Sequence, residues 1–316
     1  MKNPILTVIV TAYNREKFLK RALISAVNQT LDRNLYEIVC IKNFKNKDID
    51  GYIKKNNIVS MTAGNGIIGK YIYIASKKAK GDILVFLDDD DTFSKEKLER
   101  IYDVFKNHEV GFYHNSALKS KDLKSVSSMG MKNKNDFRII SFPYRKGFRL
   151  LKNAAFNVSS MAIKKNLLLK HGDELRTVVT SPDTFMLTVS LIENVSIFTD
   201  NNELTFYRMH NMNSSIHHNV QNAIESTDKY GIPALLYQLK LAVKYKNKTA
   251  EKMLSNYIFM FSTSLDILKG DRKHIISTLK YFSAFNKRLV ERLALVFLFL
   301  IGSRYPYNVL TRNYKK

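Results

Sequence analysis

The sequence predicts an α/β fold in which a mostly parallel, Rossmann-like sheet is flanked by helices and is followed by a helical C-terminal extension. Short apolar runs alternate with helical patterns through the first third of the chain, which is typical of a parallel sheet. From residue 219 onward the patterns are helical, with polar or glycine breaks. We therefore expect a first domain over residues 1–218 and a basic helical region over 219–316.

The elements of this fold can be assigned in chain order. A strand is predicted at 5–10 from its apolar run, and Asn14 can cap the helix that follows it. Residues 119–135 are polar with little periodicity, so we expect a surface loop there. The same patterns predict strands at 36–41, 57–61 and 83–87, and helices at 69–80, 94–106, 183–193, 224–245, 250–268 and 274–299.

The charge and the cysteine content narrow the possible functions. With 51 Lys and Arg against 28 Asp and Glu, the formal net charge is +23, which favours nucleic acid, anionic lipid or a phosphate-rich substrate as partner. The single Cys40 excludes a disulfide framework and fits a reducing compartment. No signal peptide is evident, and the longest apolar run, 293–301, is shorter than the ~20 residues of a spanning helix. We expect a cytoplasmic protein that can touch a membrane.

Four consecutive carboxylates, Asp88 to Asp91, directly follow the most apolar predicted strand. In open α/β sheets the carboxyl ends of the strands are where ligands bind. Asp88 and Asp90 project to the same side of an extended segment, where they repel each other unless a cation joins them. Hard oxygen ligands of this kind select Mg²⁺ or Mn²⁺, which usually arrive with a diphosphate. The alternative is an acidic first turn of the next helix.

Two segments resemble the family 2 glycosyltransferases with the GT-A fold. They are LTVIVTAYNREKFLKRALISAVNQT at 6–30 and KGDILVFLDDDDTF at 80–93. The resemblance implies a metal-dependent, inverting transfer of a sugar from a nucleotide-sugar, with a UDP-sugar as the first choice, to an acceptor hydroxyl in glycan or lipid-linked assembly. It also implies a nucleotide-sugar half at about 1–105 and an acceptor half at about 106–218.

The resemblance assigns roles to individual residues. Asp88 would approach the ribose, Asp89 would lie beside the nucleotide, and Asp90 with Asp88 would bind Mg²⁺ or Mn²⁺. The turn after the first strand would line the nucleotide pocket through Thr11, Ala12, Tyr13 and Arg15.

The sequence departs from the family pattern at two places. Where the family has an Asp-Asp-Gly-Ser type sequence after its second strand, this chain has Ile41-Lys42-Asn43-Phe44, so the amide of Asn43 is left to bind the base. Before the third hallmark the family often has Arg and Asn. Here Lys70 is the candidate phosphate contact, or else a solvated helix lysine.

Two further positions resemble the family's catalytic and closing motifs. Asp183, at a predicted helix start, would be the general base that deprotonates the acceptor, although an N-terminal helix carboxylate would look the same. His210, in a segment with Arg208, would complete the metal or diphosphate site, or would simply be solvated.

The C-terminal region allows two interpretations. Residues 221–316 carry 17 Lys and Arg against 6 Asp and Glu, and their apolar run 293–301 has basic flanks. This helix could lie on an anionic membrane, or it could pack on the catalytic domain or in a homodimer contact. A non-catalytic nucleic-acid-binding or assembly protein and a nucleotidyltransferase remain alternatives. No nucleic-acid module is recognisable, and no nucleic-acid partner is expected.

Overall fold

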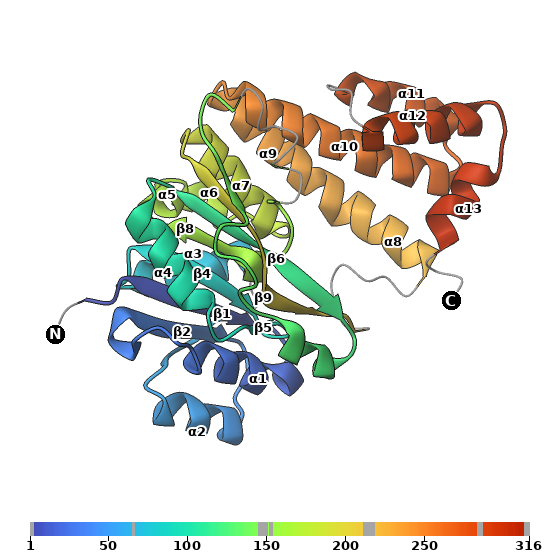
Figure 1. Cartoon of the computed structure of the whole chain (residues 1–316). Coiled ribbons are helices and arrows are strands. Elements are labelled where there is room, and N and C mark those ends of the chain that lie inside the picture. The colour runs from blue at the N-terminus through green and yellow to red at the C-terminus, as the bar shows by residue number, and fades with distance from the viewer. Residues whose placement is uncertain are drawn as a thin grey trace. The chain divides into compact units, whose positions relative to one another are not determined.

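The computed structural model describes residues 3–64, 67–144, 151, 154–210, 219–282 and 287–312. The chain divides into two compact units, Met1–Met209 and His210–Lys316 (Figure 1). The first unit contains the sheet, and the described residues of the second unit form helices only.

The first half of the sheet is parallel, as predicted. It consists of β1 (Leu6–Ala12), β2 (Tyr36–Lys42), β3 (Val59–Thr62) and β4 (Ile83–Asp88), in the order β3-β2-β1-β4. Every residue of β1 is buried, because neighbours on both sides pair with it and helices cover both faces. Cys40 is likewise buried in the middle of β2. A continuous apolar run is the pattern expected of a strand in this position.

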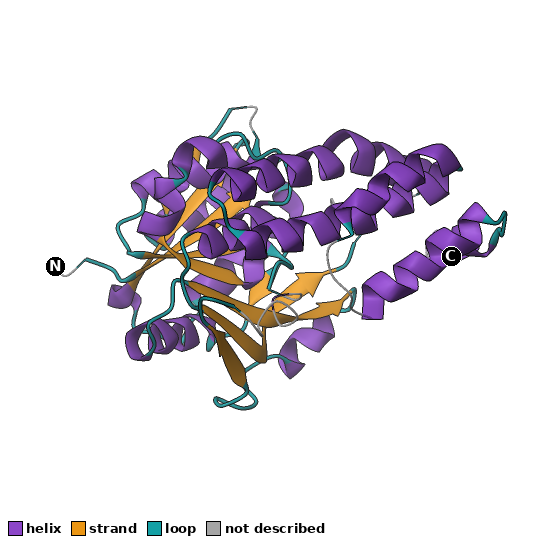
Figure 2. Ribbon diagram, turned by 90° about the horizontal axis from the view of Figure 1, so that it is seen from above, coloured by secondary structure: helices purple, strands orange, loops and turns teal. Residues whose placement is uncertain are grey.

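Helices cover the two faces of this half-sheet (Figures 1 and 2). One face packs against α1 (Glu16–Val27), α2 (Lys47–Lys55) and α4 (Lys97–Asn107), whose apolar residues join a single buried cluster with alternate residues of β1, β2 and β4. The other face carries α3 (Ile68–Lys78), which contacts β1 and β2. The expected capping by Asn14 is wrong: Arg15 is the N-cap residue of α1, and Asn14 has a left-handed backbone with φ of 56°.

The second half of the sheet is mixed and was not predicted. Strand β8 (Met161–Lys164) pairs antiparallel with β4 and with β6 (Phe112–Ser120), and β6 runs parallel to β9 (Ile197–Arg208). Two short strands, β5 (Thr92–Phe93) and β7 (Phe137–Ile140), pair with β9. The expected loop at 119–135 is therefore partly wrong, since β6 continues to Ser120 and a 3₁₀ turn, η2 (Leu123–Ser128), follows it. The remaining elements of this unit are η1 (Arg33–Leu35), η4 (Val158–Ser160), α5 (Lys165–Lys170), α6 (Gly172–Leu175) and α7 (Pro182–Ile192).

The second unit contains more, shorter helices than expected. The predicted helix at 224–245 is α8 (Val220–Ser226), a π-helical turn η5 (Thr227–Gly231) and α9 (Ile232–Lys244). The predicted helix at 274–299 is also divided, into α11 (Arg272–Thr278), η6 (Leu279–Tyr281) and α12 (Lys287–Leu300), and α13 (Tyr305–Thr311) ends the described chain. The long α10 (Lys248–Lys269) agrees with expectation. None of the described helices is both long enough and apolar enough to cross a membrane.

A buried ion pair joins α4 to β9 in the first unit. Arg100 Nε donates to Asp200 Oδ2 at 2.7 Å, and the side chains of both residues are less than a tenth exposed. Asp200 also accepts from the Tyr113 hydroxyl at 3.3 Å and from the amides of Asn202. Because these bonds replace water around a buried charge, losing either partner leaves the other charge uncompensated.

We therefore predict that Arg100→Leu lowers the free energy of unfolding by about 3–5 kcal/mol. The control is Lys20→Ala, which breaks the ion pair to Asp48, whose two side chains are 43% and 68% exposed. That pair should contribute less than about 1 kcal/mol. Urea denaturation of both variants measures the difference. Equal losses for the two variants would contradict the importance of the buried pair.

Candidate active site

The carboxyl ends of β1 and β4 bring the first predicted site residues together. The two strands are parallel neighbours, and their register places Thr11 beside Asp88. Thr11 Oγ1 donates to Asp88 Oδ1 at 3.1 Å. The parallel sheet thus joins two positions 77 residues apart in the chain at one edge, where ligands bind in open α/β sheets.

Arg15 partly neutralises the acidic run. Its guanidinium forms ion pairs with Asp89 and with Asp90, and the Nη1–Asp90 Oδ2 distance is 2.6 Å. Both carboxylate oxygens of Asp89 face Arg15, and the Asp89 side chain is fully buried. Asp89 was expected to contact the nucleotide, but in the structure its carboxylate is engaged by Arg15. The same bonds direct Arg15 toward the acidic run.

The other three aspartates form a group that fits a divalent cation. Asp88, Asp90 and Asp91 each offer a carboxylate oxygen, and these oxygens lie within 4.8 Å of one another. Asp91 is 1% exposed, and its Oδ2 has no hydrogen-bond partner among the described residues, while its Oδ1 accepts from the backbone N–H of Arg208 at 3.1 Å. An unpartnered, buried carboxylate oxygen beside two others matches the hard oxygen ligands of Mg²⁺ or Mn²⁺. Asp91 was not predicted to be a metal ligand, although it is the fourth member of the run.

Burial and mutual repulsion explain the titration of this group. Burial, followed by the charge of Asp90, raises the pKa of Asp88 to about 6. Burial, again with Asp90 as the next cause, raises the pKa of Asp91 well above its usual value. Raised pKa values mean that the ionised carboxylates are held in an unfavourable place, which a bound cation would relieve.

Asp183 lies in the first turn of α7, close to the acidic group. Its Oδ1 accepts from the backbone N–H of Thr184 at 2.8 Å, and the backbone N–H of Asn157 also bonds to its carboxylate. Burial raises the pKa of Asp183 to about 6 despite these bonds, and its charge in turn raises the pKa of Asp88. A carboxylate that titrates near 6 is ionised at neutral pH, and it accepts a proton more readily than an ordinary aspartate does.

The structure changes the interpretation of Asn43. Its Oδ1 accepts from the Asn14 backbone N–H at 2.9 Å, and its Nδ2 donates to the Asn14 Oδ1 at 2.6 Å. Both ends of the amide are therefore used inside the protein, where they fix the turn after β1. The amide oxygen keeps a second lone pair and the amide nitrogen a second N–H, so a contact of Asn43 with the base stays a prediction.

Tyr13 and Ala12 have different surroundings. Ala12 is buried at the end of β1, whereas the Tyr13 side chain is 43% exposed. The rings of Tyr13 and Tyr71 meet edge to face, with 6.0 Å between their centroids. An exposed ring fixed on one side by another aromatic side chain can stack on a planar base.

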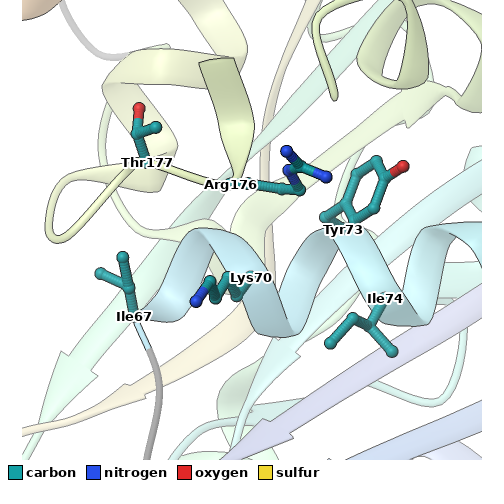
Figure 3. Close-up of a pocket in the computed structure, with 6 residues that line it drawn as sticks. All are labelled: Ile67, Lys70, Tyr73, Ile74, Arg176 and Thr177. Carbon is teal, nitrogen blue, oxygen red and sulfur yellow. The ribbon is translucent and has the colours of Figure 1, made fainter. Parts of the chain in front are cut away.

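Lys70 lines a separate hollow of about 640 Å³ between the start of α3 and the chain after α6 (Figure 3). Arg176 lies in the same hollow, with its guanidinium carbon 5.5 Å from the centre of the Tyr73 ring. The backbone N–H of Gly69 donates to the Val178 carbonyl at 3.0 Å. A Cβ at this position would lie 1.9 Å from the Leu175 carbonyl oxygen, so only a glycine allows this approach of the two segments. Arg176 was not predicted, and it is a second cation that lines this hollow beside Lys70. A phosphate contact by Lys70 stays a prediction.

The closing segment is placed only in part. Arg208 ends β9, and its backbone N–H binds Asp91, so this strand contributes to the acidic group. The Arg208 guanidinium lies 4.7 Å from the centre of the Phe18 ring. His210 begins the second unit, and residues 211–218 lie outside the described residues. They include His217 and His218, which from the sequence alone we expect to be surface residues without a role in the site. A metal or diphosphate role for His210 stays a prediction.

Comparison with known proteins identifies the family. The model of glycosyl transferase family 2 matches residues 7–172, more than half of the chain. The chain therefore belongs to this family, as the resemblance of the two segments implied. Of the alternatives considered from the sequence, a nucleic-acid-binding protein and a nucleotidyltransferase do not fit this membership.

The relatives are bacterial glycosyltransferases. A poly(ribitol-phosphate) beta-glucosyltransferase of Bacillus spizizenii is 31% identical over 112 residues, which cover 33% of this chain and 18% of that protein. An uncharacterized glycosyltransferase of Haemophilus influenzae is 25% identical over 235 residues, covering 71% of this chain and 75% of that protein. The chain therefore matches less than a fifth of the Bacillus relative.

Solved structures share the fold. Residues 1–349 of Staphylococcus aureus TarS, in complex with UDP-GlcNAc, have a TM-score of 0.61 at 16% identity, covering 98% of this chain and 91% of that chain. This chain spans 55% of the longer TarS structure. The mannosyltransferase PcManGT from Pyrobaculum calidifontis, in complex with GDP-Man and Mn²⁺, has a TM-score of 0.55 at 14% identity, covering 99% and 85%. These matches confirm the predicted GT-A fold with a helical C-terminal region.

We predict that Asp91→Asn weakens Mn²⁺ binding in the presence of UDP by at least about tenfold, because it removes a buried ligand charge. Asp90→Asn should abolish the metal-dependent part of nucleotide binding, and Asp88→Asn should weaken nucleotide binding even at saturating Mn²⁺. The control is Asp82→Asn, since the Asp82 side chain is 95% exposed beside β4. Calorimetric titration of Mn²⁺ into each protein with UDP measures the effect. Affinity equal to that of the control would remove the substituted residue from the metal site.

Proposed function

We propose that the protein is a metal-dependent, inverting glycosyltransferase that uses a UDP-sugar and an acceptor hydroxyl. The observation that carries the proposal is the group of three carboxylates, Asp88, Asp90 and Asp91, at the carboxyl ends of β1 and β4, with Asp183 close to them. One group supplies cation ligands, and the other is a carboxylate that titrates near 6. Inverting transfer needs both a stabilised leaving diphosphate and one general base.

Each residue then has a definite task. A bound Mg²⁺ or Mn²⁺ would offset the charge of the leaving nucleoside diphosphate. Asp88, Asp90 and Asp91 would hold that cation, and Arg15 keeps the local negative charge low enough for the three to stay together. Thr11 orients Asp88, and the exposed ring of Tyr13 would support the base. Asp183 would take the proton from the acceptor hydroxyl as the new glycosidic bond forms.

The nature of the substrates follows from two observations. TarS was solved with UDP-GlcNAc and with UDP, which supports a UDP-sugar as donor. The net charge of +23 favours an acceptor rich in phosphate. The Bacillus relative and Staphylococcus aureus TarS are both named as poly(ribitol-phosphate) transferases. We propose a phosphate-containing glycan or lipid-linked acceptor. Lys70 and Arg176, both at the hollow beside α3, are the cations we assign to a phosphate group.

We predict that Asp183→Asn leaves the affinity for the donor nearly unchanged and lowers the transfer rate by about 10²–10⁴-fold, the usual effect of losing a general base. The parent rate should fall below about pH 6, because protonation removes the base. The control is Asp82→Asn, because the Asp82 side chain is 95% exposed and has no proposed role in the site. Initial rates with a phosphate-containing glycan acceptor measure the effect. If Asp183→Asn transfers sugar at the parent rate, another carboxylate is the base, and Asp173 or Glu174 is tested next.

The second unit exposes apolar and basic side chains on and around its last helices. On α12 the residues Val296 and Phe299 are buried against Ile267 and Ile275, so one face of this helix belongs to the core of the unit. The opposite face exposes Val290 and Phe297, the latter 63% exposed, and Ile301, directly after the helix, is 64% exposed. Other exposed apolar and basic side chains lie on the neighbouring helices: Ile276, Tyr305, Tyr307, Val309, Lys273, Lys280, Arg304 and Arg312.

We propose that these exposed side chains form one surface that rests on the anionic face of a membrane, with the protein on the cytoplasmic side. The other face of α12 packs inside the second unit itself, which neither sequence interpretation of 293–301 expected. The exposed apolar side chains can enter the interfacial layer, and each near-surface Lys or Arg adds ~1 kcal/mol of attraction to anionic lipid. A homodimer contact through the same surface is the competing interpretation.

We predict that the double variant Phe297→Asp, Ile301→Asp loses at least about tenfold in binding to vesicles of phosphatidylglycerol and phosphatidylcholine, because it removes apolar area and adds negative charge. Its melting temperature should stay near that of the parent, since both side chains are exposed. The control is Val243→Asp, at a 56% exposed position of α9 in the same unit. Co-sedimentation at low and high salt measures binding. If the parent never sediments with these vesicles, and if the parent is a dimer while the double variant is a monomer, the competing interpretation is favoured.

A further inference from the structure

A short segment, 157–159, lies between the two parts of the candidate active site. Asn157 has a left-handed backbone, with φ of 64°, and its side chain accepts from the Ser159 N–H at 2.9 Å. This local bond closes the turn that begins η4. The backbone N–H of Asn157 bonds to the carboxylate of Asp183. One end of the segment is therefore fixed to the proposed base.

The other end of the segment is fixed to the acidic group. Ser159 Oγ accepts from the Asp88 backbone N–H at 2.9 Å. The same hydroxyl faces Asp91 and lowers the pKa of that carboxyl, although the larger effect of burial raises it. Ser159 is fully buried, so water does not compete for these contacts.

A buried lysine completes the support of this segment. Lys97 Nζ donates to the Ser159 carbonyl and to Thr205 Oγ1, the latter at 2.7 Å, and Thr205 Oγ1 donates to the same carbonyl at 3.1 Å. Lys97 is fully buried on α4, with its Nζ 4.0 Å from the centre of the Phe93 ring. The Ser159 carbonyl thus accepts from Lys97 of α4 and from Thr205 of β9. Its hydroxyl accepts from the Asp88 N–H and faces Asp91.

We propose that Ser159 is a positioning residue for the metal site, whose hydroxyl sets the separation and orientation of Asp88 and Asp91. This inference rests on the proposed metal-dependent function. Groups that hydrogen-bond to metal ligands orient those ligands, and losing one typically costs 10–100-fold in metal affinity or activity. Because the same segment also contacts Asp183, one short piece of backbone positions both the metal ligands and the proposed base.

The neighbouring Ser160 provides a matched control. Ser160 is also fully buried, and its Oγ has no hydrogen-bond partner among the described residues. Ser159→Ala and Ser160→Ala remove the same atom from adjacent buried positions. A general loss of packing should affect both variants alike, whereas loss of ligand positioning should affect Ser159→Ala alone.

The test titrates Mn²⁺ calorimetrically into the parent and both variants in the presence of UDP. We expect Ser159→Ala to bind Mn²⁺ about 10–100-fold more weakly than the parent, and Ser160→Ala to bind it as the parent does. In transfer assays, raising the Mn²⁺ concentration should restore most of the rate of Ser159→Ala. Equal Mn²⁺ affinity in both variants, or a rate deficit that does not depend on Mn²⁺ concentration, overturns the role of Ser159.

Two further outcomes keep the inference separate from the proposed function. A parent that binds no Mn²⁺ with UDP overturns the metal dependence, and the inference with it. If Ser159→Ala melts far below Ser160→Ala, Ser159→Cys is measured instead, because it keeps a side chain of similar shape while weakening both hydrogen bonds. The same two results for Mn²⁺ affinity then decide.

Discussion

The structure is organised around a concentration of negative charge at the end of a buried strand. Four adjacent carboxylates in a low-dielectric environment repel one another, and burial alone would favour their neutral forms. The fold counters this with Arg15 from the turn after β1, which pairs with Asp89 and Asp90. The backbone N–H of Arg208 and the hydroxyl of Thr11 serve the others. Elements from distant parts of the chain are thus required to make one acidic edge tolerable.

The parallel half of this arrangement could be predicted from the sequence because its determinants are local. Apolar runs of strand length, each followed by a helical pattern, identify β1, β2 and β4, and the carboxyl end of β4 is marked by the aspartates themselves. The grouping of Asp88 with Asp90 follows from the two-residue period of a strand, and the pairing of Thr11 with Asp88 follows from parallel neighbours. Here the local pattern and the tertiary fold agree.

The rest depends on contacts that no local pattern reveals. Strand β9 alternates charged and apolar residues without a clean period, and it is a strand because β6 and two short strands pair with it. Lys97 and Arg100 look like solvated helix residues in the sequence, yet the first bonds to Ser159 and the second to Asp200 in the core. The bonds between Asn43 and Asn14 are hidden for the same reason, since the two residues are 29 positions apart. Pairs of polar residues that meet only after folding carry no signal in a single sequence.

The single cysteine has a consequence for how the protein can be studied. Cys40 is buried in the middle of β2, and burial raises the pKa of its thiol to about 12. The thiolate is the species that reacts with alkylating reagents, so the folded chain offers them almost none. Alkylation proceeds instead through the rare molecules in which β2 has separated from its neighbours. Cys40 therefore reports transient opening of the sheet. Its strand, β2, lies next to β1, whose Thr11 hydrogen-bonds to Asp88. A ligand that stabilises the folded chain should slow the alkylation of Cys40, so the labelling rate measures that stabilisation.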